Sequence, residues 1–393
     1  MKRYLFLSDL HIGDGSAKDD FKYDDAFEKA FNDFSLFNDI ELFIVGDGFE
    51  LLETERVSQF GLIDFDEIVK KLDSDIILEI EKQHLKVFRA LRKFGKHNKI
   101  HYIVGNHDYY LLKNLKIQEK LKELIPNLEI EPYYYDEDLK ILIIHGNQFD
   151  PVNKFSVNKK SGEIVPPLGD YIVRYMMVNF DKKLEQFLPD NVISDYDNVR
   201  PTIDLFDWFD LIMKTHDLSI DLLEMWLIEF LKMMRSFEAK EWMKSNYPFL
   251  SIFSKLFLNN FGGIKLGEFL VRLIMNIRSL KNTDYLMKKA NKILSGNLDI
   301  KDYITGYESE REIGDTDGVI MGHIHRNNFK IFNFGNKPKY YINCGSWKPV
   351  VEKLKKGVFQ RKNELFYALL TFDGDIEITT ATINSLRRRE VII

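Results

Sequence analysis

Short apolar segments of this chain end repeatedly in a glycine-flanked polar turn, and this pattern constrains the fold more than any other feature. Ile100–Val104 has the composition of a buried strand and runs directly into Gly105-Asn106-His107-Asp108. A strand that presents Asn, His and Asp at its end is a common position for a functional site. Alone, these four residues are more typical of an ordinary exposed turn. The pattern becomes informative because four other segments end in a similar way.

Five strand-like segments are followed by side chains that can bind metal ions or act in catalysis. The segments are Arg3–Leu7, Ile40–Val45, Ile100–Val104, Lys140–Ile144 and Gly318–Met321. In the same order, the polar residues that follow them are Asp9 and His11, Asp47, Asn106 and His107, His145, and His323 and His325. Apolar residues at helical spacing lie between these segments, over residues 20–37, 65–94 and 112–124. This alternation of strands and helices predicts an α/β fold.

The alternation stops in the middle of the chain. From about Tyr171 to Leu294 the apolar residues recur at helical spacing, and strand character returns only at Gly318. Residues 329–334, 340–343, 365–372 and 375–383 then have the pattern of consecutive antiparallel strands. We therefore predict a sandwich made of residues 1–165 and 313–393, which is interrupted by an all-helical insertion at residues 166–312.

Composition narrows the classes of function. The net charge of −6 and the isoelectric point of about 5.9 argue against a protein that mainly coats nucleic acid. A single cysteine, Cys344, excludes internal disulfides and leaves oxygen and nitrogen as metal ligands. We expect a cytoplasmic protein, since Met1–Leu7 fits a first core strand better than a signal sequence and no long uncharged apolar run follows.

The polar residues at the strand ends have the chemistry of a metal site. Carboxylate, imidazole and amide oxygen are ligands that divalent cations accept. In Asp9-x-His11 and His323-x-His325, alternate residues of an extended backbone point the same way, so both members of a pair can reach one site. Each residue alone would fit a turn or a core histidine. However, five of the nine histidines lie at predicted strand ends, which favours the metal site over independent accidents. The remaining histidines, His84, His97, His101 and His216, are interpreted as structural or surface residues.

At these residues the chain resembles the calcineurin-like metallophosphoesterase family, whose motifs are D-x-H, G-D, G-N-H-D/E, H and G-H-x-H in this order. The resemblance covers Met1 to about Asp150 and about Asp315 to Ile383, outside the helical insertion. It implies an α/β/β/α sandwich of four layers and a pair of divalent metal ions. It further implies the ligands: Asp9, His11 and His325 for the first metal, Asn106, His145 and His323 for the second, with Asp47 bridging both.

The resemblance also implies a mechanism, which is hydrolysis of a phosphoester by a hydroxide that bridges two metals. His107 is the implied general acid or transition-state stabiliser, and Glu50 occupies the acidic position that orients this histidine in relatives. Manganese is the first expectation for the metal, and iron, zinc, cobalt or nickel would accept the same ligands.

Within the family, the motifs around Asp47, His145 and His323 are most similar to the branch that contains UDP-2,3-diacylglucosamine pyrophosphatase. Members with that activity commonly have Arg where this chain has His107, and they are smaller, with a shorter helical lid. A phosphodiester, a pyrophosphate and a phosphomonoester therefore all stay open as substrates.

The insertion allows three interpretations. It is rich in Met, Phe, Trp and Leu, for instance in residues 205–209 and 225–231. Such residues fit a helical bundle with its own core, a lid that admits a lipid-linked or nucleotide-sugar substrate, or a surface for homodimer formation. A lipid-binding lid would also bring peripheral contact with a membrane.

Two further functions are alternatives to this phosphoesterase. The first is a nuclease or protein phosphatase of the same fold, in which Lys154, Lys159 and Lys160 would begin a basic groove for nucleic acid. The second is a scaffold that binds metal without catalysis, which would predict gaps among the metal ligands. The ligand set described above has no gap.

Overall fold

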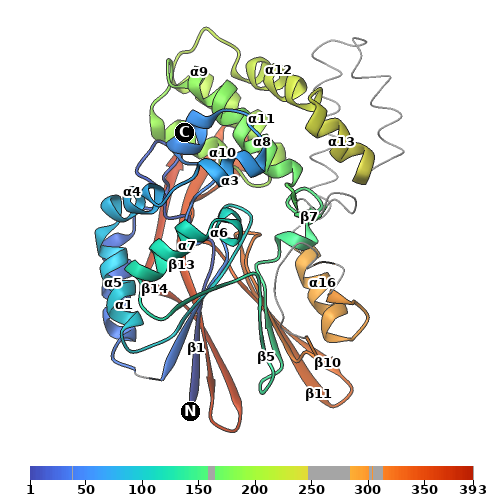
Figure 1. Cartoon of the computed structure of the whole chain (residues 1–393). Coiled ribbons are helices and arrows are strands. Elements are labelled where there is room, and N and C mark those ends of the chain that lie inside the picture. The colour runs from blue at the N-terminus through green and yellow to red at the C-terminus, as the bar shows by residue number, and fades with distance from the viewer. Residues whose placement is uncertain (38, 158–163, 247–283, 301–302, 304–312, 393) are drawn as a thin grey trace.

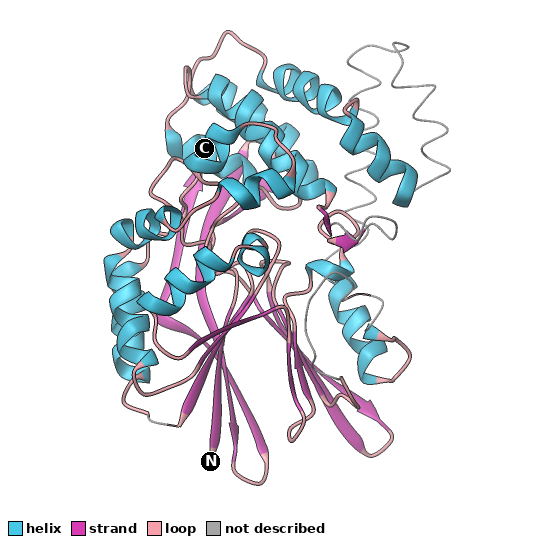
Figure 2. Ribbon diagram, viewed as in Figure 1, coloured by secondary structure: helices cyan, strands magenta, loops and turns pink. Residues whose placement is uncertain are grey.

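Two sheets face each other in the structure (Figures 1 and 2). The computed structural model describes residues 1–37, 39–157, 164–246, 284–300, 303 and 313–392. The larger sheet has seven strands in the order β12-β13-β1-β2-β3-β4, with β14 paired to β13. Their bounds are β1 Lys2–Leu7, β2 Ile40–Val45, β3 Ile100–Ile103, β4 Leu128–Glu131, β12 Val350–Lys355, β13 Val358–Phe372 and β14 Ile376–Ile392. Because β1, β2, β3 and β4 are parallel neighbours, their carboxyl ends meet at one edge.

The smaller sheet has five strands in the order β10-β11-β9-β6-β5. Their bounds are β5 Tyr134–Asp136, β6 Ile141–Ile143, β9 Gly318–Met321, β10 Asn327–Phe334 and β11 Lys337–Cys344. β6 and β9 are parallel neighbours, so the residues that follow them also lie side by side. A separate two-stranded sheet joins β7 (Ser156–Val157) to β8 (Ile164–Val165).

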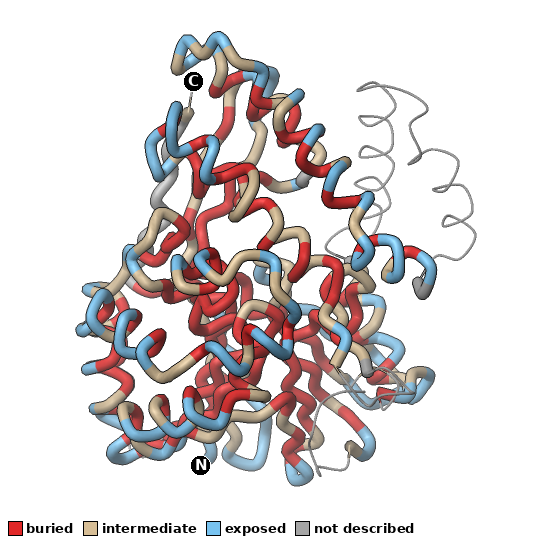
Figure 3. Tube along the Cα trace, turned by 45° about the horizontal axis from the view of Figure 1, so that its top comes forward, coloured by how far each residue is buried: buried red, intermediate tan, exposed pale blue. Residues whose placement is uncertain are grey.

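The sandwich has four layers, which are held together by hydrophobic clusters. Figure 3 shows the buried residues along its strands. Between the sheets, Phe6 and Phe43 of the larger sheet pack with Ile141, Ile320 and Ile342 of the smaller one. On the other face of the larger sheet lie α1 (Asp24–Phe34), α4 (Asp75–Gln83), α5 (Leu85–Gly95) and α7 (Leu115–Leu124). On the other face of the smaller sheet lies α16 (Asp284–Leu294). This order of helix, sheet, sheet and helix confirms the predicted fold class.

The amphipathic segment predicted over residues 65–94 is divided into three helices. These are α3 (Phe65–Lys71), α4 and α5, and the short helices α2 (Glu55–Phe60) and α6 (Tyr110–Lys113) lie near them in the chain. The chain leaves the helical conformation at Leu72 and again at His84. His84 is held there by Asp19, 2.8 Å from its Nε2, and by Asp24, 3.1 Å from its Nδ1. These contacts with distant residues override the local helical periodicity.

The last strand is longer than the predicted segment 375–383. β14 continues to Ile392 because β13 begins at Val358, seven residues before the predicted start at Leu365, and pairs with it almost throughout. The register places Glu364 opposite Arg387 and Phe359 opposite Ile392. The strand therefore follows the length of its partner, which local sequence does not reveal.

The helical insertion lies over the carboxyl ends of the parallel strands (Figure 1). The helices of the predicted insertion in this position are α8 Leu168–Met176, the π-helical turn η2 Met177–Asp181, α9 Lys182–Leu184, α10 Asp190–Asp197, η3 Thr202–Asp204, α11 Leu205–Thr215, α12 Leu222–Met234 and α13 Phe237–Asn246. α16 also falls within the predicted residues 166–312, but it packs on the smaller sheet. Within the described residues, no helix is long and apolar enough to cross a membrane. Residues 247–283, which belong to the predicted insertion, lie outside the described residues.

The insertion has a hydrophobic core of its own, which also includes two residues of the sandwich. Trp208, Phe209 and Leu227 are buried in it together with Val351 of β12 and Phe359 of β13. The ring of Trp208 lies edge-on to the ring of Phe359 at a centroid distance of 5.1 Å. The insertion is therefore packed directly onto the larger sheet.

Candidate metal centre

The structure brings the nine predicted site residues together above the carboxyl ends of five strands. Asp9 and His11 follow β1, Asp47 follows β2, Asn106 and His107 follow β3, His145 follows β6, and His323 and His325 follow β9. Glu50 lies in the loop after β2, which bonds to the loop after β1 through Glu50 N and Ile12 O at 2.9 Å. The two sheets thus supply opposite sides of one site.

Five of these residues have a left-handed backbone, which is unusual for residues other than glycine. The φ angles are 50° for Asp9, 49° for His11, 50° for Asp47, 71° for His323 and 55° for His325. Such conformations concentrate at functional sites because the surrounding structure must compensate for their cost. Here the compensation includes backbone bonds from Asp9 N to Gly46 O at 3.0 Å and from His11 N to Asp47 O at 2.9 Å.

The first predicted metal position is formed by Asp9, His11 and His325. Their ligand atoms lie within 4.8 Å of one another. The Nε2 atom of His325 is 3.2 Å from Asp9 Oδ1, and the Nε2 atom of His11 is 4.0 Å from the same oxygen. The other carboxylate oxygen of Asp9 accepts hydrogen bonds from Ser8 Oγ at 2.5 Å and from His323 N at 2.9 Å. Asp9 is therefore held with Oδ1 directed at the two histidines.

The second predicted position is formed by Asp47, His145, Asn106 and His323. His145 Nε2 lies 3.1 Å from Asp47 Oδ2, while His145 Nδ1 lies 2.8 Å from Val45 O and donates to it. The rings of His145 and His323 have centroids 5.3 Å apart. Asp47 Oδ2 is also 4.0 Å from His11 Nε2 of the first position. Asp47 is therefore placed between the two groups, as a bridging ligand would be.

Buried atoms without a hydrogen bond test whether this set fits metal ions. Asp9 Oδ1, His11 Nε2, Asn106 Oδ1 and His145 Nε2 are buried and make no hydrogen bond of acceptable geometry within the described residues. A buried polar atom without a partner is costly, so such atoms are rare. All four are atoms that would face a bound cation. The residues present therefore fit the pair of metal ions.

Two glycines make this close packing possible. Gly46 has φ +83°, and a Cβ there would lie 2.1 Å from His145 Nδ1. A Cβ at Gly105 would lie 2.1 Å from Asp47 Oδ1. Any other residue at either position would displace a predicted ligand.

Glu50 contacts two histidines, of which the sequence indicated only one. Its Oε2 is 2.7 Å from His11 Nδ1, and its Oε1 is 3.0 Å from His107 Nδ1. The backbone N–H groups of Leu52 and Glu53 donate to Oε1 at 3.1 and 2.9 Å. Because Glu50 accepts a hydrogen bond from Nδ1 of each ring, it fixes the orientation of both rings. The Nε2 atom of each ring then points away from Glu50.

Two acidic residues near the centre were missed by sequence reasoning. Asp108 holds the turn after β3, because it accepts from Gly105 N at 2.6 Å, Gly48 N at 3.0 Å and Tyr102 Oη at 2.6 Å. Asp150 Oδ2 lies 3.3 Å from His323 Nε2. The only available signal was that both acidic residues closely follow a predicted site residue, Asp108 one position after His107 and Asp150 five positions after His145.

The electrostatics of the centre favour positive charge. Burial opposes ionisation of Asp47, but the charge of His145 and a bond to it hold the pKa of Asp47 well below its usual value. Burial likewise opposes protonation of His145, but Asp47 and Asp9 raise its pKa to about 9. For His107, the charge of Glu50 outweighs burial and raises the pKa to about 10. Burial, reinforced by the charges of His11 and Arg200, lowers the pKa of His325 to about 4 against the attraction of Asp9.

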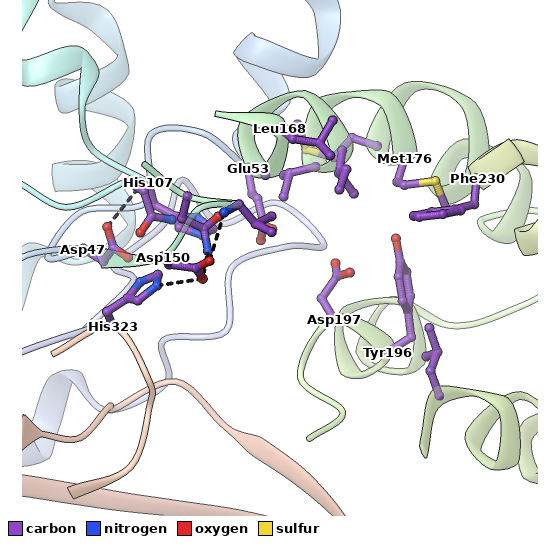
Figure 4. Close-up of a pocket in the computed structure, with 18 of the residues that line it drawn as sticks. Asp47, Glu53, His107, Asp150, Leu168, Met176, Tyr196, Asp197, Phe230 and His323 are labelled. Atoms are coloured by element: carbon purple, nitrogen blue, oxygen red, sulfur yellow. Dashed lines mark hydrogen bonds and ion pairs between the residues drawn. The ribbon is translucent and has the colours of Figure 1, made fainter. Parts of the chain in front are cut away.

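A cavity of about 280 Å³ leads from these residues into the insertion (Figure 4). Asp47, His107 and His323 lie at one end, and Met176 and Phe230 lie at the other. The apolar lining residues are Val152, Leu168, Ile172, Val173, Met176, Met177, Leu205, Trp226, Phe230, Met234, Trp242 and Met243. The polar lining residues also include Glu53, Tyr196, Asp197, Arg200 and Lys348. The site is thus a polar centre that opens into an apolar chamber.

Comparison with known proteins agrees with this geometry. A family model described as calcineurin-like phosphoesterase matches residues 2–212, which is more than half of the chain. The match includes β1, β2, β3, β6 and the loops that carry Asp9 to Asp150. A comparison with curated proteins found no match. On the strength of the family match, this chain belongs to the calcineurin-like phosphoesterase family and is a metal-dependent hydrolase of phosphoester bonds.

Proposed function

We propose that this chain hydrolyses a phosphoester that carries a hydrocarbon chain, and that the insertion accepts this chain. The observation that carries the proposal is the single cavity that joins the metal centre to the apolar chamber. An apolar chain placed in that chamber would gain about 25 cal/mol for each Å² of surface removed from water. The phosphoester at its end would then lie beside the predicted metal ligands.

The predicted ligand roles are part of this proposal. Asp9, His11 and His325 would hold one cation, Asn106, His145 and His323 would hold the other, and Asp47 would contact both, with manganese as the first choice of metal. When bound, the two cations would supply Lewis-acid charge that offsets the charge of the phosphoryl group and lowers the pKa of water. The four buried atoms without hydrogen bonds support this ligand set.

His107 is proposed to act on the leaving oxygen. Its Nδ1 is bonded to Glu50, so Nε2 is the nitrogen that can donate a proton. Burial opposes protonation of this ring, but the charge of Glu50 raises its pKa and favours the protonated form. The backbone N–H of His107 donates to Asp47 Oδ1 at 2.8 Å, which ties the position of this acid to the bridging carboxylate.

A nuclease is less well supported. Of the three lysines that would begin a basic groove, Lys154 lies over the ring of Tyr303 at 5.2 Å, and Lys159 and Lys160 lie outside the described residues. The chamber at the other end of the cavity is lined mainly by aliphatic, thioether and aromatic side chains, which suit a hydrocarbon chain.

The test uses p-nitrophenyl alkyl phosphodiesters whose alkyl group ranges from methyl to dodecyl. With manganese-loaded full-length protein, kcat/KM should rise with chain length, by about fourfold for each buried methylene group at first. Ile172→Asp places a charge in the chamber wall and should abolish this increase while leaving the methyl ester unaffected. Val192→Asp is the matched control, because Val192 is also half-buried in the core of the insertion but does not line the cavity.

Two outcomes would contradict the proposal. One is a kcat/KM that does not depend on chain length in the native protein. The other is an equal loss of chain-length dependence in Ile172→Asp and Val192→Asp, which would point to general damage to the insertion.

A further inference from the structure

Lys348 is a buried lysine on the wall of the main cavity. It is 6% exposed, and its Nζ lies 3.2 Å from Glu53 Oε2 and 3.8 Å from Asp20 Oδ2. An ammonium group has three donors, and Glu53 accepts from one of them. The contact with Asp20 is too long for a hydrogen bond. Glu53 and Lys348 both line the cavity beside His107.

The backbone of Lys348 is held in place by hydrogen bonds that lead to Asp9, a predicted metal ligand. Ser346 Oγ and Trp347 N donate to Asp9 O at 3.0 and 3.1 Å, and Lys348 N donates to Ser346 Oγ at 2.8 Å. Trp347 is fully buried and donates from Nε1 to Phe366 O at 3.0 Å. The ammonium therefore extends from a support that is fixed relative to Asp9.

Arg200, a residue of the insertion, is a second cationic residue that lines the same cavity. Its backbone N–H donates to Val351 O of β12 at 2.8 Å, and its Nη1 donates to Asp197 O at 2.6 Å and Val199 O at 2.9 Å. Arg200, Lys348 and His325 all line the main cavity. Lys348 and His325 also border a smaller adjoining cavity of about 50 Å³. Lys348 and His325 thus share two cavities, and Arg200 shares the larger one with them.

Comparison with Lys18 separates a structural role from a binding role. Lys18 is also buried where the insertion meets the sandwich, with Asp181 2.7 Å away, Asp197 in contact and the ring of Tyr196 beneath it. It does not line the cavity. Burial of an ammonium group costs several kcal/mol unless partners compensate it. Lys18 is compensated by two aspartates and lies away from the cavity, as expected for a lysine that only joins the two parts. Lys348 carries the same cost of burial, but it lines the cavity.

We propose that Lys348 and Arg200 form an anion-binding pair beside His325 that binds anionic oxygens of the phosphoester substrate. This inference rests on the proposed function, because it assumes that the phosphoester occupies the cavity. The oxygens belong either to the phosphoryl group at the metal centre or to a second phosphoryl group next to it. The pair acts on substrate binding, since its charge is present before and after hydrolysis.

The experiment is isothermal titration calorimetry on manganese-loaded, full-length protein. Methylphosphonate offers one phosphoryl group, and methylenediphosphonate offers two. The variants are Lys348→Met, Lys348→Arg and Arg200→Gln, with Lys18→Met as the matched control and a thermal melt for each. Binding needs no turnover, so the result is independent of whether the native protein prefers long-chain phosphodiesters.

We expect Lys348→Met and Arg200→Gln to weaken methylenediphosphonate binding about tenfold or more, which is typical for loss of a charge-assisted bond. Lys348→Arg should restore most of the affinity, and Lys18→Met should lower the melting temperature without changing the affinity. Loss confined to the diphosphonate would place the pair at a second phosphoryl group, and loss for both compounds would place it at the first.

Three outcomes would overturn the proposal: no binding of either compound to the native protein, unchanged affinity in the variants, or an equal loss in Lys18→Met. If Lys348→Met does not fold, Arg200→Gln decides, because Arg200 is only half-buried.

Discussion

Left-handed backbone conformations set the predicted ligands apart at the scale of single residues. Asp9, His11, Asp47, His323 and His325 account for five of the eight non-glycine residues with positive φ in the described part of the chain. Such a residue costs on the order of 1–3 kcal/mol. These conformations therefore lower the stability of the fold in order to direct the side chains at a common point. Binding of cations to the folded protein would restore part of this free energy.

Asp47 is the residue on which the metal centre depends most. Asp47→Asn should reduce metal-dependent hydrolysis of bis(p-nitrophenyl) phosphate by at least ~100-fold, because the amide cannot bridge two cations as a carboxylate does. Metal content, measured by mass spectrometry after gel filtration, should fall in parallel. Asp217→Asn is the control, since Asp217 is an exposed aspartate with φ 48°. Full activity in Asp47→Asn would refute the ligand assignment.

Glu50 shows what sequence reasoning reaches at this scale and what it misses. Its position three residues after Asp47 indicated contact with His107, and this contact is present. The contact with His11 at 2.7 Å joins two motifs that lie 39 residues apart, and no local pattern encodes that distance.

At the scale of elements, His84 separates α4 from α5. It also connects them to Asp19, in the loop after β1, and to Asp24, the first residue of α1. Burial opposes protonation, but hydrogen bonds to Asp19 and Asp24 raise its pKa from 6.5 to about 9. A raised pKa in the folded state stabilises the fold fully below pH 6.5, and this stabilisation is lost as pH rises through about 9.

His84→Gln tests this assignment. The native protein should lose on the order of 2 kcal/mol of its unfolding free energy between pH 6.5 and 9.5 through this group, and the variant should lose correspondingly less. Urea unfolding at the two pH values gives the comparison. The exposed His97, changed to Gln, is the control. Equal pH dependence in the native protein and His84→Gln would show that His84 does not carry the effect.

At the scale of the whole molecule, the insertion and the sandwich share one packed interface. Trp208 of α11 lies against Phe359 of β13, and Val351 of β12 is buried in the same core. Lys353 of β12 and Asp207 of α11 form an ion pair beside it. We therefore expect the two parts to unfold together.

Trp208→Ala should destabilise the protein by about 3–5 kcal/mol, because it leaves a cavity in the shared core. Differential scanning calorimetry should show one transition at a lower temperature, with loss of both parts at once. Phe187→Ala removes an exposed aromatic residue of the insertion and should change stability little. A separate early transition in Trp208→Ala would show that the insertion unfolds independently.

The sequence by itself determined the α/β class, the order of the five polar turns and the presence of a helical insertion, because these depend on periodicity and on short motifs within single elements. Only the tertiary structure decided that His84 divides a predicted helix, that β14 extends to Ile392, and that Glu50 serves two histidines. It also decided that the insertion forms the apolar end of the cavity and that Lys348 and Arg200 line it. These features arise from contacts between residues far apart in the chain, whose geometry is set by the packing of the sheets and not by any local pattern. The turn Gly105–Asp108, ambiguous by itself, gained its meaning in the same way, when Asp47 and Glu50 came to lie beside it.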